Sequence, residues 1–342
     1  MKFGPVPLTL AAGKILGHNV AGPDGRRLLR KGKGLTVEDL ESLAAIGRET
    51  VYVAELEPDD VGEDEAARRV ASAAGPGLRQ VGPSHGRTNL VAEGPGILRV
   101  DVERLDRINS CEGITVATLM ANTPVRVKDI AATVKVIPFA VPESYVRLAE
   151  MIAEDEERPP ISVDELFPQP VGMIYSGSPA LREKIDSDFE PLRDRIEALG
   201  SQIVDREYIP LDDDAGEAAL AEALCRQLES GVQLLLLAGE TAIMDRRDIV
   251  PRALERAGGS VEAVGVPVDP GHLLMLGYLH GIPVLGLPGC ARSRKTNVVD
   301  WILPRLLAGD HLKRSDLIPL GHGGLLEDTL QRPMPRAAVE EL

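Results

Sequence analysis

A run of five apolar residues, LLLLA at positions 234–238, most limits what this chain can fold into. An uninterrupted run of this kind is typical of a strand buried on both faces, as in a parallel sheet that helices cover on either side. Segments with strand patterns alternate with segments of helical apolar spacing throughout residues 169–310. This alternation predicts a doubly wound α/β domain, whose ligands bind beyond the carboxyl ends of the strands.

The sequence before residue 153 is richer in strand patterns, and we expect it to form a smaller, strand-rich α+β domain over residues 1–152. One helix is expected after Thr36, because Thr36 and Asp39 form a capping-box pattern ahead of apolar residues at helical spacing. Several segments of β-branched residues are expected to be strands. They are residues 50–53, 96–101, 113–118 and 132–139.

A chain of 342 residues has room for about two domains, and the sequence indicates a linker between them. Residues 154–160 contain four acidic residues and then two prolines, through which a helix cannot easily continue. We therefore predict a linker over residues 153–168. The α/β domain is expected to occupy residues 169–310, and a C-terminal tail is expected over residues 311–342.

The composition argues against several classes of function. Acidic residues outnumber Lys and Arg by 53 to 38, and the net charge of −15 opposes non-specific binding to nucleic acid or to anionic membranes. Aromatic residues make up only 3% of the chain, so stacking platforms for single-stranded nucleic acid are scarce. No apolar run is long enough to span a bilayer, and the first residues lack a secretory signal pattern. We expect a cytoplasmic protein with neither a nucleic-acid nor a membrane partner.

The cysteines and histidines do not suggest a resident metal. Cys111, Cys225 and Cys290 are far apart in the sequence and fit neither a disulfide framework nor a zinc site. The six histidines are not at metal-ligand spacing. The P-loop, dinucleotide-binding and serine-hydrolase motifs are also lacking. The sequence thus predicts no metal-ligating residues and none of these standard enzyme classes.

Four polar, glycine-rich segments each follow an expected strand of the α/β domain. Backbone N–H groups at the start of a following helix can bind an anion, and arginine side chains can bind phosphate. Taken singly, each segment also fits an ordinary turn or helix cap. Facing the same edge of the sheet, together they predict a site for a phosphorylated ligand. The candidate binding residues are Ser176, Gly177, Ser178, Asp186 and Ser187, then Gly239, Glu240, Thr241 and Asp248, then Pro270, Gly271 and His272, and finally Pro288, Gly289, Cys290, Arg292, Ser293 and Arg294.

Charged residues in these segments suggest particular roles. Arg292, Arg294 and Lys295 place three cations within four residues of an acidic chain, just before an expected helix, which favours phosphate there. Asp245 and Asp248 could cap the helix that follows or bind a ligand amine.

Several of these groups, in this order and spacing, resemble the molybdopterin-binding domain shared by molybdopterin adenylyltransferases, molybdopterin molybdotransferases and competence-damage-related proteins. The resemblance covers about residues 168–308 and implies a three-layer α/β fold for them. Three segments before this region, residues 3–7, 86–90 and 132–139, extend the resemblance. With them, the whole chain resembles the module that some bacteria fuse to a molybdenum-cofactor nucleotidyltransferase. The matching groups are Ser176-Gly177-Ser178, Lys184-Ile185-Asp186-Ser187, Ala238-Gly239-Glu240-Thr241 with Asp245 and Asp248, Asp269-Pro270-Gly271-His272, and Gly286-Leu287-Pro288-Gly289-Cys290.

The resemblance implies that molybdopterin or the molybdenum cofactor is the ligand, in cofactor biosynthesis or delivery. It also implies a homo-oligomer, with other cofactor-assembly proteins or a molybdoenzyme as partners. Five departures from the family's pattern fall in the loops. Glu240 stands where the family usually has a second glycine, and Ser178-Pro179 replaces Glu-Leu; the others are Ala242, His272 and Cys290. Because a carboxylate at Glu240 would repel phosphate, we favour a binding protein. One alternative is an active, magnesium-dependent adenylyl- or molybdotransferase, in which Asp245 and Asp269 are the candidate catalytic carboxylates and magnesium would bridge one of them to the phosphate. The other is a non-catalytic nucleotide-ligand sensor or scaffold.

Overall fold

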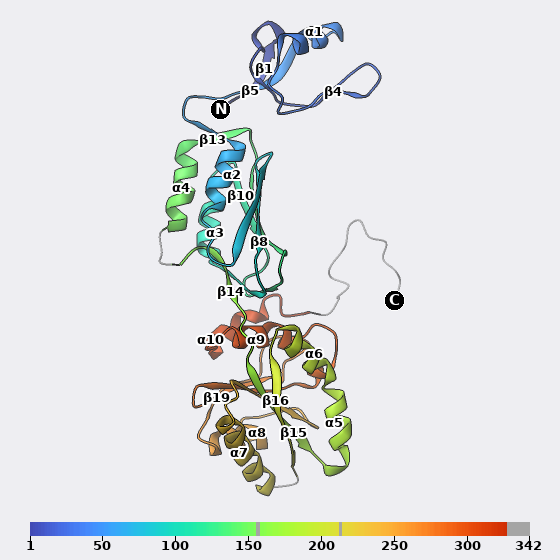
Figure 1. Cartoon of the computed structure of the whole chain (residues 1–342), viewed down its shortest axis with the longest axis vertical. Coiled ribbons are helices and arrows are strands. Elements are labelled where there is room, and N and C mark those ends of the chain that lie inside the picture. Colours follow the sequence, from blue (N-terminus) through green and yellow to red (C-terminus); the bar gives the residue numbers. More distant parts are fainter. Residues whose placement is uncertain (155–157, 212–213, 327–342) are drawn as a thin grey trace. The chain divides into compact units, whose positions relative to one another are not determined.

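The structure is a computed structural model that describes residues 1–154, 158–211 and 214–326, and it divides into two compact units, Met1–Asp164 and Glu165–Leu342 (Figure 1). Helices and sheets are mixed in both units, which confirms the expected α/β class with a second α+β part. Within the described residues, none of the helices combines the length and apolar character that a bilayer crossing requires.

The domain boundaries drawn from the sequence stay predictions. Strand β14 (Ile161–Glu165) lies inside the expected linker and joins a sheet of the first unit beside β9 (Gly96–Val100). Residues 155–157 of the expected linker lie outside the described residues, as do residues 327–342 of the expected tail.

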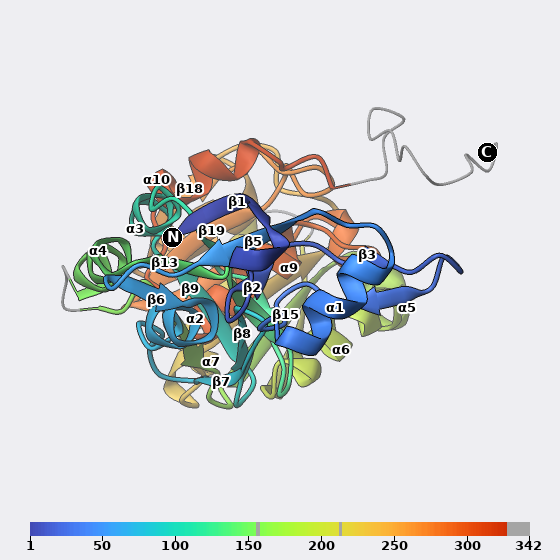
Figure 2. The ribbon, with the colours of Figure 1, turned by 90° about the horizontal axis from the view of Figure 1, so that it is seen from above.

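The first unit begins with a three-stranded antiparallel sheet in the order β1 (Lys2–Pro7), β5 (Thr50–Glu55) and β2 (Ile15–Leu16) (Figure 2). Helix α1 (Val37–Ala45) begins at the capping box expected from the sequence, in which the Asp39 N–H donates to Thr36 Oγ1 at 3.3 Å. Strands β3 (Val20–Ala21) and β4 (Arg27–Leu29) form a hairpin beside this sheet.

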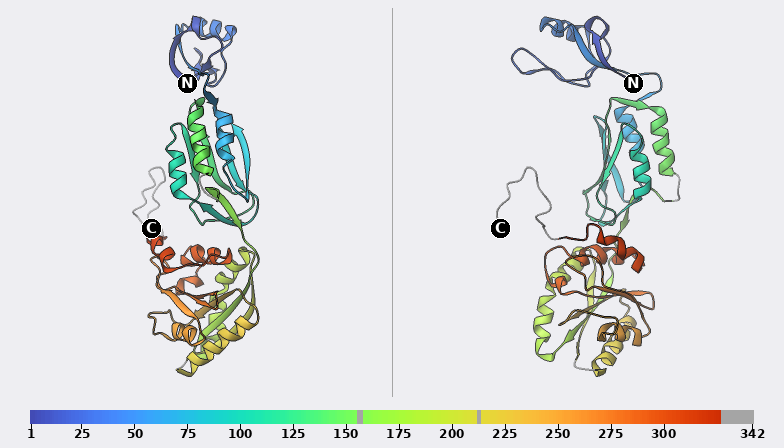
Figure 3. Two further views of the ribbon diagram at one scale, coloured as in Figure 1. Left: turned by 90° about the vertical axis from the view of Figure 1, so that its left-hand side faces the viewer. Right: turned by 180° about the vertical axis from the view of Figure 1, so that it is seen from behind.

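The rest of the first unit is a four-stranded sheet in the order β10-β12-β8-β7, with helices on one face (Figures 1 and 3). Smaller ladders pair β11 (Pro124–Val125) with β9 and β13 (Ala140–Pro142) with β6 (Asp60–Gly62). The strands of the larger sheet are β7 (Leu78–Ser84), β8 (Arg87–Ala92), β10 (Ile114–Thr118) and β12 (Ile130–Val136), and the helices are α2 (Glu63–Ala71), α3 (Val102–Asn109) and α4 (Glu143–Glu154).

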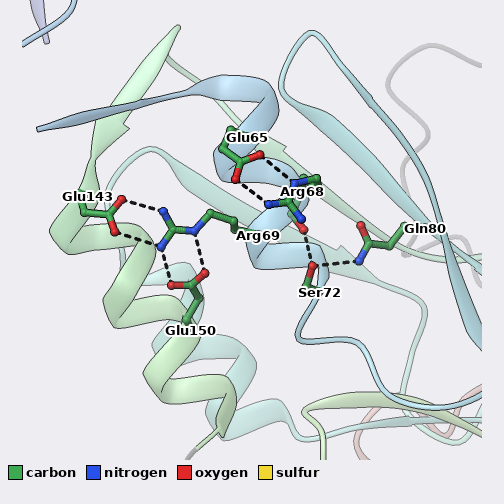
Figure 4. Close-up of polar contacts among 7 residues, drawn as sticks. All are labelled: Glu65, Arg68, Arg69, Ser72, Gln80, Glu143 and Glu150. Atoms are coloured by element: carbon green, nitrogen blue, oxygen red, sulfur yellow. Dashed lines mark hydrogen bonds and ion pairs between the residues drawn. The ribbon is translucent and has the colours of Figure 1, made fainter. Parts of the chain in front are cut away.

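Helices α2 and α4 are joined by Arg69, whose guanidinium contacts two carboxylates of α4 (Figure 4). Arg69 Nη1 donates to Glu143 Oε2 at 2.7 Å, and Arg69 Nη2 donates to Glu150 Oε2 at 2.6 Å. Arg147 also donates to Glu143, at 2.8 Å. Hydrogen bonds from Arg69 and then Arg147 lower the pKa of the Glu143 carboxyl from its ordinary value of 4.5 to about 2.

This contact predicts an acid-sensitive contribution to stability. Because the folded state lowers the pKa of Glu143, the stabilisation is complete above about pH 4.5 and is lost as the pH falls toward 2. Arg69→Met should therefore be less stable than the wild type at pH 6. Between about pH 6 and pH 3, its free energy of unfolding should fall by less than that of the wild type. Urea unfolding followed by circular dichroism across this range measures both effects.

Arg68→Met is the matched control, because Arg68 bonds Glu65 one helical turn away within α2, and both side chains are about half exposed. A contact of this kind contributes little. If Arg68→Met and Arg69→Met change the pH dependence equally, the link between α2 and α4 is not its source.

The second unit is built on a six-stranded sheet in the order β16-β15-β17-β20-β19-β18. The first four strands are parallel, and β19 runs antiparallel to both of its neighbours. The apolar run at 234–238 is in β17, where all five residues are buried, as expected for a strand covered on both faces. The strands are β15 (Pro170–Gly177), β16 (Gln202–Pro210), β17 (Leu234–Gly239), β18 (Ser260–Val264), β19 (Met275–Leu279) and β20 (Ile282–Gly286).

Helices cover both faces of this sheet and complete the expected three layers. Figure 1 shows α7 and α8 on one side and α5 and α6 on the other. Leu235 and Leu237 of β17 pack in one apolar cluster with Leu224 of α7 and Leu254 of α8. The helices are α5 (Arg182–Asp188), α6 (Glu190–Ala198), α7 (Asp214–Glu229), α8 (Ile249–Arg256), α9 (Val298–Leu307) and α10 (Arg314–Leu317).

Candidate ligand-binding site

The strand order places a topological switch point at β15. The chain leaves β15 for β16 on one side, and then crosses to β17 on the other side. In open α/β sheets, ligands bind in the crevice beyond the carboxyl ends of the strands at such a point. The first, second and fourth polar segments follow β15, β17 and β20, so the fold brings their starts to this edge.

Two hydrogen bonds join the loops after β15 and β17. The Glu240 N–H donates to the Ser176 carbonyl at 2.8 Å, and the Ser178 N–H donates to Glu240 Oε2 at 2.8 Å. Gly177 lies between them, and a Cβ there would come within 2.9 Å of Glu240 Cβ. Glycine is required at this position because any larger residue would push the two loops apart.

The Glu240 carboxylate thus accepts a hydrogen bond from the Ser178 N–H, a backbone donor that could otherwise bind an anion. Hydrogen bonds from Ser178 lower the pKa of this carboxyl, so Glu240 is charged at neutral pH. Its side chain is exposed, which leaves it room to move away from Ser178. Glu240, at the position where the family usually has glycine, is therefore a hydrogen-bond acceptor for the backbone of the first loop.

The carbonyl groups of the first loop are also engaged. The Gly177 carbonyl accepts from the Leu211 N–H at 3.2 Å, and the Ser178 carbonyl accepts from the Tyr208 hydroxyl at 2.6 Å. Tyr208 lies on β16 and was not among the residues selected from the sequence. Its role depends on the pairing of β15 with β16, which local sequence patterns do not reveal.

Arg292 connects the fourth segment to the second. Arg292 Nη2 donates to the Gly239 carbonyl at 2.5 Å, and Nη1 lies 3.8 Å from Asp188 Oδ2. The guanidinium carbon lies 5.0 Å from the centre of the Phe189 ring. Its Nε is buried and has no hydrogen-bond partner within the described part of the chain. Arg292 is therefore fixed at the crevice, where its side chain is 31% exposed.

The other cations of the fourth segment have different partners. Arg294 Nη1 lies 2.5 Å from Asp194 of α6, and Nη2 lies 3.9 Å from Glu190 of the same helix. Lys295 donates its backbone N–H to Ser293 Oγ at 3.1 Å. The three cations therefore do not form one cluster: Arg292 lies at the crevice, whereas Arg294 is paired along α6.

Asp186 and Ser187 lie on α5, after the first loop. Asp186 Oδ1 lies 3.5 Å from Arg193 Nη1 and 3.5 Å from Arg206 Nη1, so it links α5 to α6 and β16. Arg193 Nη1 also donates to the Tyr175 hydroxyl at 3.1 Å. Ser187 is exposed. Asp186 thus has partners within the protein.

The acids of the second segment are bound within their own loop. Asp245 Oδ1 accepts from the N–H and from Nε of Arg247, each at 2.9 Å, and these bonds lower the pKa of the Asp245 carboxyl. Asp248 is the N-cap of α8 and accepts from the Ile249 and Met244 N–H groups, each at 3.0 Å. Thr241 is exposed.

The third segment follows β18, at the opposite edge of the sheet from β16. Asp269 Oδ1 lies 3.6 Å from His272 Nδ1, and both side chains are more than half exposed. The Val298 N–H donates to the Pro270 carbonyl at 3.0 Å, which joins this segment to the start of α9. A Cβ on Gly271 would lie 2.2 Å from Val298 Cγ1, so glycine permits this approach.

Asn297 and Cys290 complete the fourth segment. Asn297 caps α9 by accepting from the Val299 N–H at 3.0 Å, and its Nδ2 donates to the Cys290 carbonyl at 3.1 Å. Burial raises the pKa of the Cys290 thiol, which keeps it protonated at neutral pH. An asparagine just before an apolar helical pattern is an N-cap signal, and it could have identified Asn297 from the sequence.

Among the described residues, no three His, Cys, Asp or Glu side chains lie close enough together to hold a metal ion. The catalytic assignments of Asp245 and Asp269 stay predictions, as do the binding assignments. The contacts bring the first, second and fourth segments together through Ser178, Glu240, Gly239 and Arg292.

Comparisons with known proteins cover different parts of the chain. Residues 5–55 match the model of a domain of unknown function, DUF8806. No curated protein matches the sequence. Similar solved structures include a molybdenum cofactor biosynthesis protein from Pyrococcus furiosus, at 13% identity and a TM-score of 0.25, with 93% of this chain and 65% of that chain covered. Another is the molybdopterin biosynthesis MoeA protein from Pyrococcus horikosii, at 12% identity and a TM-score of 0.29, with 90% and 75% covered. The chain thus spans slightly less than two thirds of the length of the first.

Proposed function

We propose that the crevice beyond β15, β17 and β20 binds a phosphorylated pterin of the molybdopterin type, and that the chain serves molybdenum cofactor biosynthesis or delivery as a binding protein. The observation that carries this proposal is the joining of three loops at the switch point, through Glu240 to Ser178 and through Arg292 to Gly239. These loops belong to the segments whose order resembles the molybdopterin-binding domain. The names of the two similar solved structures agree with the proposal, which does not rest on them.

Binding is favoured over catalysis because the acids proposed for chemistry have partners within the protein. Asp245 is bonded to Arg247, and Asp269 Oδ1 lies 3.6 Å from His272 Nδ1. A carboxylate that must bridge a metal to phosphate would first have to leave such a partner. The guanidinium of Arg292, by contrast, is fixed at the crevice with its side chain 31% exposed, and its Nη1 has only a 3.8 Å contact with Asp188 Oδ2.

Calorimetry of the full chain with molybdopterin, its nucleotide form and NAD tests the proposal. We expect either pterin ligand to bind more tightly than NAD. Arg292→Ala should weaken pterin binding by about tenfold, because it removes a charged donor at the crevice. Arg294→Ala is the matched control and should leave the affinity unchanged, since Arg294 pairs with acids of α6.

Equal or tighter binding of NAD would contradict the pterin assignment. An absence of measurable pterin affinity would support the sensor or scaffold alternative instead. Magnesium-dependent turnover of molybdopterin with ATP, or of adenylylated molybdopterin with molybdate, would show that the chain is an enzyme.

A further inference from the structure

The first 35 residues differ sharply in charge from the rest of the chain. They contain seven Lys and Arg residues and a single acidic residue, Asp24, whereas the whole chain has a net charge of −15. Most of these cations lie on or beside the hairpin of β3 and β4. A local positive surface therefore exists in a protein whose average charge is negative. Charges farther away than about 8 Å are largely screened at physiological salt.

Several cations of this hairpin have no acidic partner. Arg27, Arg30 and Lys31 are exposed, and within the described part of the chain none of their side chains lies in a salt bridge. Arg26 is 3.9 Å from Asp24, with its side chain 90% exposed. Lys33, in contrast, is paired with Asp39 of α1 at 2.6 Å. The unpaired cations are therefore available to an external anion.

Three aromatic rings lie together on the adjoining sheet. The rings of Phe3 and His18 are 5.6 Å apart, those of His18 and Tyr52 are 5.2 Å apart, and those of Phe3 and Tyr52 are 6.1 Å apart. Phe3 is 48% exposed and Tyr52 is 47% exposed. Because successive residues of a strand face opposite sides, Tyr52 faces away from the core that buries its neighbours Val51 and Val53.

The cationic segment runs directly beside the segment that carries His18. The Lys31 N–H donates to Asn19 Oδ1 at 2.9 Å, and the Gly32 N–H donates to the Leu16 carbonyl at 2.7 Å. These bonds place Lys31 next to the His18-Asn19 pair. The segment of the unpaired cations therefore adjoins the segment of His18, beside the small β1-β5-β2 sheet, whose ribbon Figure 2 shows.

We propose that this surface, consisting of Phe3, His18, Tyr52 and the cations of residues 26–31, binds single-stranded nucleic acid. Phosphates would pair with the cations, and unstacked bases would pack on the aromatic rings, the two interactions on which sequence-tolerant single-strand binding depends. An acidic protein as the partner would account for the exposed cations, but it would not account for the exposed aromatic rings. The composition of the whole chain led to the opposite expectation because it averages over this local surface.

The test is fluorescence anisotropy of a labelled 12-nucleotide single strand, as RNA and as DNA, titrated with the full chain at several salt concentrations. We expect binding that weakens with salt. The triple variant Arg27→Gln, Arg30→Gln and Lys31→Gln should lower the affinity at least tenfold. It should also reduce the slope of log affinity against log salt by about 2, since each single-strand phosphate contact contributes about 0.7.

Tyr52→Leu tests the stacking separately, because leucine keeps apolar contacts with Phe3 but presents no ring. It should lower the affinity about tenfold and leave the salt slope unchanged. The control is the triple variant Arg79→Gln, Arg87→Gln and Arg126→Gln, which removes three exposed cations elsewhere in the first unit. It should bind like the wild type. Circular dichroism verifies that each variant is folded.

Three results would overturn the proposal. The first is an absence of binding by the wild type at about 50 mM salt. The second is an equal loss of affinity in the control triple variant, which would indicate a general charge effect. The third is binding of heparin as tight as that of the oligonucleotide together with no effect of Tyr52→Leu, which would indicate an acidic partner without bases.

Discussion

Replacing Arg104 with alanine is expected to lower the free energy of unfolding of the first unit by about 3–5 kcal/mol. Arg104 lies on α3 and is only 2% exposed. Its Nε donates to the Ile152 carbonyl at 3.1 Å, its Nη1 donates to the Arg158 carbonyl at 2.6 Å, and its Nη2 donates to the Ala153 carbonyl. One side chain thus satisfies the carbonyls at the end of α4 and just beyond it.

The size of this effect follows from the end of a helix. The last carbonyls of a helix have no partner within it, and a cation there also interacts favourably with the helix dipole. In Arg104→Ala the carbonyls of Ile152 and Ala153 would lose their donor in a region that water does not reach freely. Leaving buried polar groups unpaired costs more than a hydrogen bond normally contributes.

Urea unfolding of the full chain measures the loss, with far-UV circular dichroism reporting on both units and the fluorescence of Trp301 reporting on the second unit. Arg104→Lys should lose part of the stability, because one ammonium cannot reach all three carbonyls as a guanidinium does. Arg147→Ala is the matched control. It should change the free energy of unfolding little, because the Arg147 side chain is 72% exposed. A loss below about 1 kcal/mol in Arg104→Ala would contradict this account.

Sequence patterns correctly predicted those helices and strands that depend on interactions between residues close together in the sequence. The capping box of Thr36 and Asp39 begins α1 as expected, because its two reciprocal contacts span only three residues. The apolar run at 234–238 is the central strand β17, because burial on both faces requires such a run whatever the neighbouring strands are.

The contacts that form the candidate site could not be predicted in the same way. Arg292 and Gly239 are 53 positions apart, and only the parallel pairing of β17 with β20 brings their loops together. Asp245 illustrates the opposite case, because its partner Arg247 is only two residues away. An ion pair between such near neighbours competes with a catalytic role of the carboxylate. The residue types alone do not show whether Asp245 pairs with Arg247 or remains available for catalysis.

Glu240 opposes anion binding in two ways, of which its charge is the first. Its carboxylate was expected to repel a ligand phosphate through charge alone. The structure adds that this carboxylate accepts a hydrogen bond from the Ser178 N–H, the donor that a bound anion would use. Charge repulsion and competition for one donor therefore act in the same direction, and both would end if the carboxylate were removed.

We accordingly expect Glu240→Gly to tighten binding of phosphorylated pterin by about tenfold or more. Glu240→Gln separates the two causes, because its amide oxygen can still accept from Ser178 but carries no charge. Its affinity should fall between those of the wild type and Glu240→Gly. Glu255→Gln, on an exposed position of α8, removes the same charge elsewhere in the unit and should leave the affinity unchanged.

Calorimetry at several salt concentrations completes this comparison, since a repulsion between charges weakens as salt screens it. The difference in pterin affinity between Glu240→Gln and the wild type should therefore shrink at high salt. The difference in affinity between Glu240→Gly and Glu240→Gln should persist. Weaker binding in both variants would have a different meaning. It would show that Glu240 contacts the ligand directly, through an amine donor of the pterin, and that the hydrogen bond to Ser178 holds the carboxylate ready for that contact.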